Sequence, residues 1–274
     1  MSDSLWSFDA QQPPARDWDE ESDEEEEERS EEEQSGPRLT SPPLPHESYE
    51  LLVISCDAQS NAFISGCVLR TDGWTLVGDV SCDGQRRAEC EGEHRTEKLC
   101  TLHEHSKAPR TLIGCCSFIP ENVLYDLTDM FLKYASGSKG TDALPEKQNS
   151  SLKVVILTSL PLSSYLSPHS TDQLPTPLVR SLSTEPYLLT LERPAPQLEV
   201  PNIVTGIAAA TLTECALQSI SATLLLSYSS LSSHDPVTIS SFFKPAHLTP
   251  MASLLRVSPT IYTQPQLVPS NLYC

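Results

Sequence analysis

Six cysteine and histidine side chains lie close together in one stretch of this sequence and could bind a metal. Within 24 residues stand Cys82, Cys90, His94, Cys100, His103 and His105. Thiolate and imidazole are the ligands that zinc prefers in proteins. Structural zinc sites usually contain closely spaced cysteine pairs, and this stretch has no C-x-x-C pair. Zinc binding by residues 82–105 is therefore an alternative hypothesis and not the leading one.

The sequence contains none of the compact motifs that mark a nucleotide-binding or hydrolytic site. It has no phosphate-loop lysine motif and no G-x-G-x-x-G pattern, and Gly137–Gly140 is typical of a flexible loop. It also lacks the G-x-S-x-G turn that positions a nucleophilic serine in α/β hydrolases. These patterns predict no catalytic residue and no cofactor. A diverged α/β enzyme remains an alternative interpretation.

The last three residues, Leu272, Tyr273 and Cys274, could form a short binding element. They combine an apolar side chain, a ring with a hydroxyl group and a terminal carboxylate. The preceding residues include Pro259, Pro265 and Pro269, which favour an extended and solvated chain. Capture of a C-terminal carboxylate is a recurring mode of peptide recognition. Taken alone, the three residues are explained better as an ordinary chain end.

The N-terminal segment is strongly acidic. Residues 1–35 contain fifteen acidic residues and two arginines, a net charge of −13. The whole chain carries −19, which leaves −6 for the remaining 239 residues. A block of like charges with few apolar residues stays disordered, so residues 1–47, including the proline-rich connector Pro37–Pro45, are predicted to form a disordered acidic arm. The acidic charge argues against nucleic acid as a partner.

Nothing in the sequence indicates secretion or a membrane span. The first residues lack the basic flank and apolar run of a signal peptide, and no run of about 18 apolar residues occurs. The nine cysteines are odd in number and irregularly spaced, which favours free thiols in a reducing compartment. The expected location is the cytoplasm, with association with the endoplasmic reticulum as an addition.

Apolar patterns between the arm and the terminus predict alternating strands and helices. A mostly parallel central sheet flanked by helices, an α/β layered fold over residues 48–258, is the expected architecture, followed by a flexible tail over residues 259–274. Residues 61–69 fit either a strand or a short helix, and residues 81–109 and 161–201 are expected to be largely loop. Strands are predicted at 50–55, 75–80, 110–119, 152–158 and 222–228, and helices from Pro120 to Ser136, at 203–217, at 235–243 and at 251–257.

Several of these segments, in their order and spacing, resemble the proteasome assembly chaperone 1 family. The resemblance covers roughly residues 48–274, is densest between 174 and 245, and is weakest over 81–109. It is carried by Leu174–Arg180, Leu198–Val204 with the small-residue helix that follows, Ala222–Tyr228, Phe242–Pro245, the acidic N-terminal run and the ending Ser270–Cys274.

The resemblance implies a non-catalytic chaperone that pairs with proteasome assembly chaperone 2 on the assembling α-ring of the 20S proteasome. The family's terminal motif, hydrophobic–tyrosine–any residue, enters a pocket between neighbouring α-subunits. By this resemblance Leu272 would fill an apolar notch, Tyr273 would pack its ring and donate its hydroxyl, and the carboxylate of Cys274 would meet a lysine. The helices near 121–134 and 203–217 are candidates for the dimer face, although core packing explains their apolar stripes equally well. A generic scaffold with an accidental terminus is a further alternative.

Overall fold

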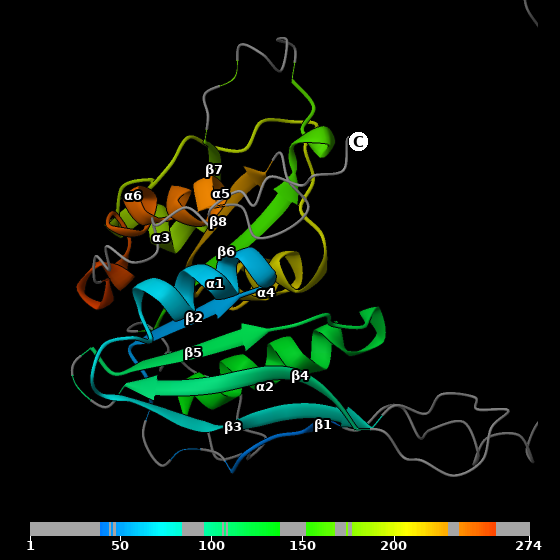
Figure 1. Cartoon of the computed structure of the whole chain (residues 1–274), viewed down its shortest axis with the longest axis vertical. Helices are drawn as coiled ribbons and strands as arrows, with labels where there is room; N and C mark the ends of the chain where they lie inside the picture. Colours follow the sequence, from blue (N-terminus) through cyan, green and yellow to red (C-terminus); the bar gives the residue numbers. More distant parts are fainter. Residues whose placement is uncertain are drawn as a thin grey trace, which may run out of the picture. The chain divides into compact units, whose positions relative to one another are not determined.

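The computed structural model describes residues 39–43, 45, 48–83, 96–105, 107, 109–137, 152–167, 174, 177–229 and 236–255 of the chain. Its centre is an eight-stranded sheet in the order β1-β3-β4-β5-β2-β6-β8-β7 (Figure 1). The strands are β1 (Leu39–Thr40), β2 (Leu51–Ser55), β3 (Trp74–Asp83), β4 (Thr96–His105), β5 (Thr111–Cys116), β6 (Lys153–Pro161), β7 (Leu178–Ser183) and β8 (Ser221–Ser229).

The sheet is parallel in its centre and antiparallel toward both edges. Strands β5, β2, β6 and β8 run parallel, and β1, β3, β4 and β7 pair antiparallel with their neighbours. Every residue of β2 is buried, as a strand covered on both faces requires. The predicted α/β fold is confirmed, and its parallel part is the central block.

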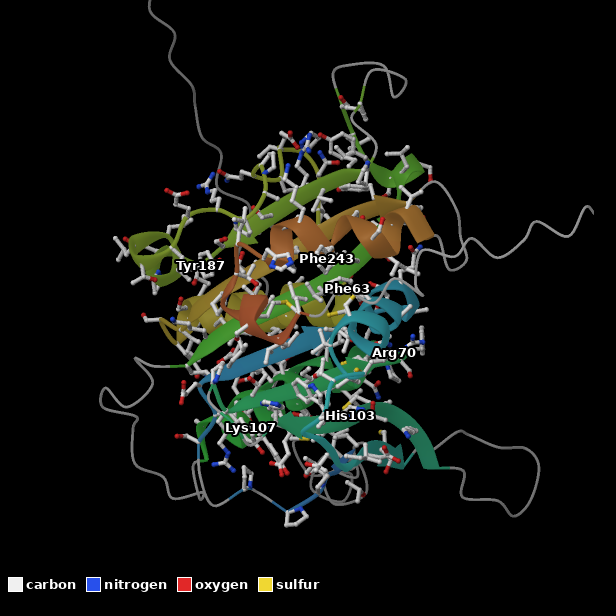
Figure 2. All side chains as sticks on the ribbon, turned by 60° about the vertical axis from the view of Figure 1, so that its left-hand side comes forward. Phe63, Arg70, His103, Lys107, Tyr187 and Phe243 are labelled. Atoms are coloured by element: carbon white, nitrogen blue, oxygen red, sulfur yellow. The ribbon has the colours of Figure 1, made fainter. Side chains whose placement is uncertain are left out.

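Helices cover both faces of this sheet. On one face, α2 (Leu124–Ser136) and α4 (Gly206–Leu217) pack against a shared apolar core. The opposite face carries α1 (Ala58–Cys67), α5 (Pro236–Ser241), α6 (Phe243–Ala246) and a 3-10 turn, η5 (Pro250–Leu254). Figure 2 shows Phe63 of α1 and Phe243 of α6 on the same side of the sheet. The remaining short elements are η2 (Glu121–Val123), η3 (Leu162–Ser164) and α3 (Glu185–Thr190).

Helix α2 shows why the sequence signals predicted a helix correctly. The chain enters η2 directly after Pro120, and Gly137, with φ of +67°, closes α2 in the left-handed conformation that glycine adopts without cost. The buried side of α2 includes Leu127 and Phe131, as the predicted stripe requires. Gly114 of β5 faces this stripe, and a Cβ added there would lie 2.7 Å from Cε1 of Phe131. The missing side chain on Gly114 lets α2 approach the sheet closely.

The prediction that residues 81–109 are largely loop was wrong for β4. This ten-residue strand pairs with β3 on one side and β5 on the other. Leu99, Cys100 and Leu102 are buried, while charged residues such as Lys98 lie on a partly exposed part of the strand. A strand near the edge of a sheet tolerates such polar residues. In β4 they interrupt the apolar pattern by which a strand is predicted from sequence.

Three other segments bear on the sequence expectations. Residues 61–69, left open between strand and helix, belong mainly to α1. The segment 161–201 contains the edge strand β7 as well as the expected short helical turns. Strand β1 lies within the stretch assigned to the acidic arm and pairs with β3. In the described residues, no helix is both long and apolar enough to cross a membrane.

Candidate functional site

The three predicted partner-binding residues, Leu272, Tyr273 and Cys274, lie outside the described residues. Cys90 and His94 of the zinc hypothesis lie outside them as well. Any other candidate site lies in the folded body, among the described residues between 39 and 255. Four features of this body could bind or transform another molecule: the cysteine and histidine residues of β3 and β4, the carboxyl ends of β2 and β6, a pocket at the opposite end of these strands, and a polar network beside β7.

The described cysteine and histidine residues of β3 and β4 do not converge. Cys100 packs in the core beside the thiol of Cys116, and this contact together with burial raises the pKa of Cys116 well above its ordinary value. His103 lies three residues along β4 and therefore points to the opposite face of the sheet. Cys82 packs in a separate cluster with Leu99. Within the described residues, no three side chains of the metal-ligating types are placed to share an ion.

The Nδ1 atom of His105 lies 3.3 Å from the carbonyl oxygen of Lys107, and its ring packs against Trp74 at 5.0 Å between centroids. Burial lowers the pKa of His103, which keeps its imidazole neutral. In the described residues, no disulfide joins any of the cysteines. These side chains serve the packing of the β3–β4 region.

The carboxyl ends of β2 and β6, where α/β sheets commonly bind ligands, hold a structural carboxylate. Asp57 caps α1 through its Oδ1, which accepts hydrogen bonds from the backbone N–H groups of Gln59 and Ser60 at 2.8 and 3.0 Å. Its Oδ2 accepts from the backbone N–H of Ser159 at 2.6 Å, and Oδ1 also accepts from the Ser159 hydroxyl. The donors that would hold an anionic ligand are thus used by the protein itself, and the negative charge disfavours phosphate there.

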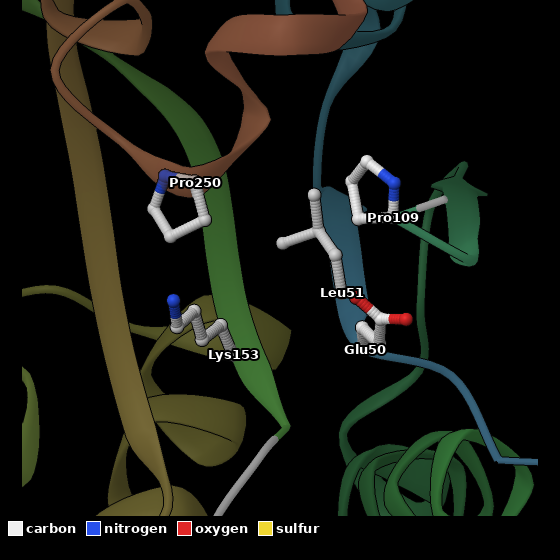
Figure 3. A pocket seen from close by; sticks show the side chains of 5 residues that line it. All are labelled: Glu50, Leu51, Pro109, Lys153 and Pro250. Atoms are coloured by element: carbon white, nitrogen blue, oxygen red, sulfur yellow. The ribbon is translucent and has the colours of Figure 1, made fainter. Parts of the chain in front are cut away.

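A pocket of about 350 Å³ lies at the opposite end of these strands (Figure 3). Its lining consists of Glu50, Leu51, Pro109, Lys153 and Pro250. These five residues supply one carboxylate and one ammonium group among apolar walls, but no hydroxyl, thiol or imidazole. They therefore provide no hydroxyl or thiol nucleophile and no histidine base for acid–base chemistry.

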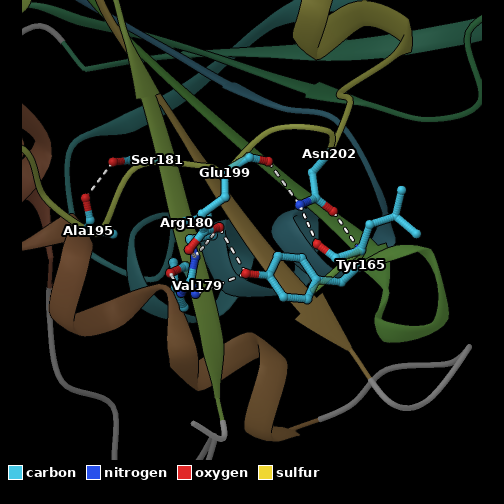
Figure 4. Close-up of polar contacts among 8 residues, drawn as sticks. Tyr165, Val179, Arg180, Ser181, Ala195, Glu199 and Asn202 are labelled. Carbon is cyan, nitrogen blue, oxygen red and sulfur yellow. Dashed lines mark hydrogen bonds and ion pairs between the residues drawn. The ribbon is translucent and has the colours of Figure 1, made fainter. Parts of the chain in front are cut away.

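The fourth feature is a polar network that joins two of the segments that carry the resemblance, 174–180 and 198–204. Arg180 of β7 donates from Nε to both carboxylate oxygens of Glu199 at 2.9 Å, and from Nη2 to the hydroxyl of Tyr165 at 3.1 Å (Figure 4). Tyr165 in turn donates to Oε2 of Glu199 at 2.9 Å. The arginine side chain is mostly buried and the glutamate is about half exposed. This charge-assisted pairing fixes the loop that carries Glu199 against the sheet edge.

Asn202 completes the network on the other side of the same loop. Its Oδ1 accepts from the backbone N–H of Leu166 at 2.7 Å, and its Nδ2 donates to the carbonyl oxygens of Leu166 and Glu199. The loop after β6 and the loop before α4 are therefore joined by side-chain hydrogen bonds (Figure 4). Both loops are held in one conformation by these polar contacts. The side chains on the outer side of the loops take no part in apolar packing.

These braced loops present apolar side chains to solvent. Val200 is 94% exposed and Ile203 is 74% exposed, and Leu166 is exposed beside them. Leu198, two residues before Val200, is only 6% exposed and packs in the core. Exposed apolar groups on a fixed backbone suit protein binding, because little ordering entropy remains to be lost on association. The resemblance marked residues 198–204 and 174–180, but Tyr165 was missed, because no sequence signal exists for it.

The Arg180–Glu199 pair leads to a prediction about pH. Hydrogen bonding from Arg180 lowers the pKa of Glu199 below its ordinary value. A carboxyl group with a lowered folded-state pKa stabilises the fold above its unfolded-state pKa, and this contribution disappears as the pH falls through the folded-state pKa. We expect Glu199→Gln to lower the unfolding free energy by about 1 kcal/mol near neutral pH, a value reduced for solvent screening.

The difference between wild type and Glu199→Gln should shrink as the solution is acidified, measured by urea unfolding at a series of pH values. Glu192→Gln, which removes an exposed carboxylate from the same region, is the matched control and should show no such dependence. An equal cost of Glu199→Gln at neutral and strongly acidic pH would show that the ion pair contributes nothing.

The folded body is thus an α/β layered domain whose described surface offers a braced apolar binding loop. This combination suits a domain that binds other proteins. Comparison with known proteins gives the family. The family model PAC1, described as proteasome assembly chaperone 4, matches residues 47–264, which includes the whole body described from Tyr49 onward. The chain belongs to the PAC1 family of proteasome assembly chaperones.

Two curated proteins to which this chain is similar are named proteasome assembly chaperone 1. The protein of Xenopus tropicalis is 31% identical over 197 residues, which cover 70% of this chain and 63% of that protein. The protein of Danio rerio is 27% identical over 234 residues, covering 81% and 78%. The chain thus spans about 63% of the length of the Xenopus relative it matches.

Among solved structures, the monoclinic form of PbaA from Pyrococcus furiosus, an archaeal homolog of proteasome-assembly chaperone, superposes with a TM-score of 0.54 at 15% identity. The match covers 82% of this chain and 86% of that one. At this identity the likeness shows a shared fold. The sequence-based prediction of the family is confirmed by the family model and by the curated relatives.

Proposed function

We propose that this chain is a non-catalytic chaperone that promotes assembly of the α-ring of the 20S proteasome. The observation that carries the proposal is the family match over residues 47–264. The names of the curated relatives support it. A further support is the braced apolar loop around Val200 and Ile203, a feature suited to binding proteins. The proposed working form is a heterodimer with proteasome assembly chaperone 2, acting in the cytoplasm.

The proposed contact with the ring is made by the tail, residues 259–274. Leu272 would enter an apolar notch between two α-subunits, Tyr273 would pack its ring and donate its hydroxyl, and the carboxylate of Cys274 would pair with a lysine. Three residues alone bind weakly, because ordering the chain offsets much of the contact energy. Tethering to a docked body raises the effective concentration of the tail. Sixteen residues reach at most about 50 Å when extended, enough to enter a pocket beside a docked domain.

The acidic arm, residues 1–47, has a proposed role outside this contact. Its net charge over residues 1–35 is −13, and such a segment repels other acidic surfaces and can shield a basic one. The arm would keep the chaperone from unspecific association with acidic proteins. This role depends on charge alone and needs no folded structure in the arm.

Affinity purification of the tagged full chain from its native cells tests the function. The expected result is recovery of proteasome α-subunits together with proteasome assembly chaperone 2, identified by mass spectrometry in near-equal amounts. Zinc content of the same material tests the alternative. Recovery of the chain without α-subunits, or with stoichiometric zinc and an unrelated set of proteins, would contradict the chaperone proposal.

A further inference from the structure

Exposed apolar side chains gather where α2 and α4 begin. Helix α2 follows β5 and leads back to the amino end of the parallel strand β6, so it starts at the carboxyl end of the sheet. Helix α4 precedes β8, which is parallel to β6, so it also starts at that end. The two helices pack side by side on one face of the sheet. Phe118 before α2 is 78% exposed and Tyr125 in its first turn is 69% exposed.

The braced loops expose further apolar side chains at the same end of the sheet. Ile203 stands just before α4, and the hydrogen bonds of Asn202 place Leu166 beside it. We name this surface the carboxyl rim and define it by Phe118, Tyr125, Leu166, Val200 and Ile203. The polar network of Arg180, Glu199 and Tyr165 braces its loop part, so this part of the rim is fixed before any partner binds.

The charged side chains that neighbour Phe118 and Tyr125 in the sequence are acidic. Residues 117–132, which hold the loop before α2 and its first nine residues, contain no lysine or arginine, and neither do residues 194–218, which include α4 and the loop before it. Lys133, in the last turn of α2, pairs with Asp129. Two acidic side chains, Glu121 and Asp126, are exposed next to Phe118 and Tyr125, and neither forms an ion pair with another described residue. The carboxyl rim therefore combines apolar area with uncompensated negative charge.

This charge decides what kind of partner fits. A second copy of this chain, docked through the same surface, would bring acidic groups together with no basic group on these segments to offset them. A different chain, with apolar side chains bordered by lysine or arginine, would bury the apolar area and pair the charges. The surface thus favours a hetero-interface over a homodimer.

We propose that the carboxyl rim is the surface through which this chain binds its heterodimer partner, and that the partner's matching surface is apolar with a basic border. The inference rests on the proposed function, from which it takes the existence of a heterodimer. It assigns the interface to the outer side of the carboxyl rim, at the starts of α2 and α4. The buried stripes of these helices belong to the core.

An apolar double variant, Tyr125→Ser with Ile203→Ser, tests the carboxyl rim. Both side chains are exposed, so the fold should survive, and thermal unfolding of the variant alone checks this. The matched control is Leu76→Ser with Leu189→Ser, which removes similarly exposed apolar groups from β3 and α3. The probe is full-length proteasome assembly chaperone 2, titrated against the full chain. We expect the rim variant to raise Kd at least about tenfold, as central interface residues do, and the control to leave it unchanged.

A charge variant tests the sign of the partner surface. Glu121→Lys with Asp126→Lys should weaken binding at low salt, with the loss diminishing as salt is added. Glu185→Lys with Glu192→Lys makes the same change of net charge on exposed residues elsewhere, and Glu185 also lies in a first helical turn. This control should bind chaperone 2 nearly as wild type does.

The possible failures are distinguishable. If wild type binds chaperone 2 and both rim variants bind it equally well, the carboxyl rim proposal is overturned while the proposed function stands. The rim proposal is overturned in the same way if the rim variants lose only α-subunits and keep chaperone 2. If wild type itself does not bind chaperone 2, the proposed heterodimer is wrong and the inference falls with it.

Discussion

Deletion of Leu272–Cys274 is expected to weaken binding of the full chain to α-ring intermediates by about 100-fold. The tail acts as the second attachment of a body that is already docked, so its removal forfeits the gain in effective concentration. The carboxylate is lost as a positioned charge at the same time, because the new chain end stands three residues earlier. Binding is measured by titrating purified α-ring intermediates with the wild-type and shortened chains.

Three single changes separate the parts of this motif. Cys274→Ser keeps the terminal carboxylate and should bind as wild type, because the thiol lies at the position the motif leaves open. Tyr273→Ala removes the ring and hydroxyl and should cost about tenfold or more. One glycine added after Cys274 moves the carboxylate and should behave like the deletion. Binding of chaperone 2, which the carboxyl rim is proposed to mediate, should be the same for all of these chains. If the shortened chain bound ring intermediates as tightly as wild type, the tail would have no part in docking.

The elements predicted best from sequence were those whose burial is nearly complete. Residues 50–55 and 152–158 gave continuous apolar runs because β2 and β6 are covered on both faces. The helix from Pro120 to Ser136 was marked by its first proline, its stripe and the glycine after it. In such segments the local pattern and the tertiary environment agree, so the sequence alone suffices.

Strand β4 could not be found in this way, because its partners decide its structure. Between Lys98 and His105 the alternation of buried and exposed positions is incomplete, and Leu99 and Cys100 are both buried where the β3–β4 register shifts. A bulge of this kind breaks the period of two on which strand prediction relies. The strand is stabilised by hydrogen bonds to β3 and β5. The apolar pattern within residues 96–105 does not reveal this pairing.

The candidate site was predicted only in part. Segments 174–180 and 198–204 were marked by resemblance, but nothing in either shows that Arg180 meets Glu199, since the pairing depends on the path of the chain between them. Exposure was equally hidden: Leu198 is in the core and Val200 faces solvent within one short apolar segment. The role of Asp57 was missed, although the sequence carried a signal for it. An aspartate followed by Ser60 three positions later is typical of a helix N-cap.

Phe131→Ala is expected to lower the free energy of unfolding by about 3–5 kcal/mol, a large part of the roughly 5–15 kcal/mol typical of a domain. The ring is fully buried in the core between α2 and the sheet, and its loss leaves a cavity that the surrounding strands cannot close. Urea unfolding followed by circular dichroism measures the change. Tyr125→Ser, an exposed change on the same helix, is the control and should cost far less.

Gly114 provides the stricter test of that contact. Gly114→Ala should itself cost about 1–3 kcal/mol, because the added Cβ would stand 2.7 Å from the Phe131 ring. Phe131→Leu replaces the ring with a smaller side chain and makes room for that carbon. The double variant, Gly114→Ala with Phe131→Leu, should therefore lose less stability than the sum of the losses of the two single variants. Strictly additive costs would mean that the two residues do not touch. A coupled result would show that the bare backbone of β5 at Gly114 is what allows α2 to lie close to the sheet, and hence sets the position of the first turn that carries Tyr125.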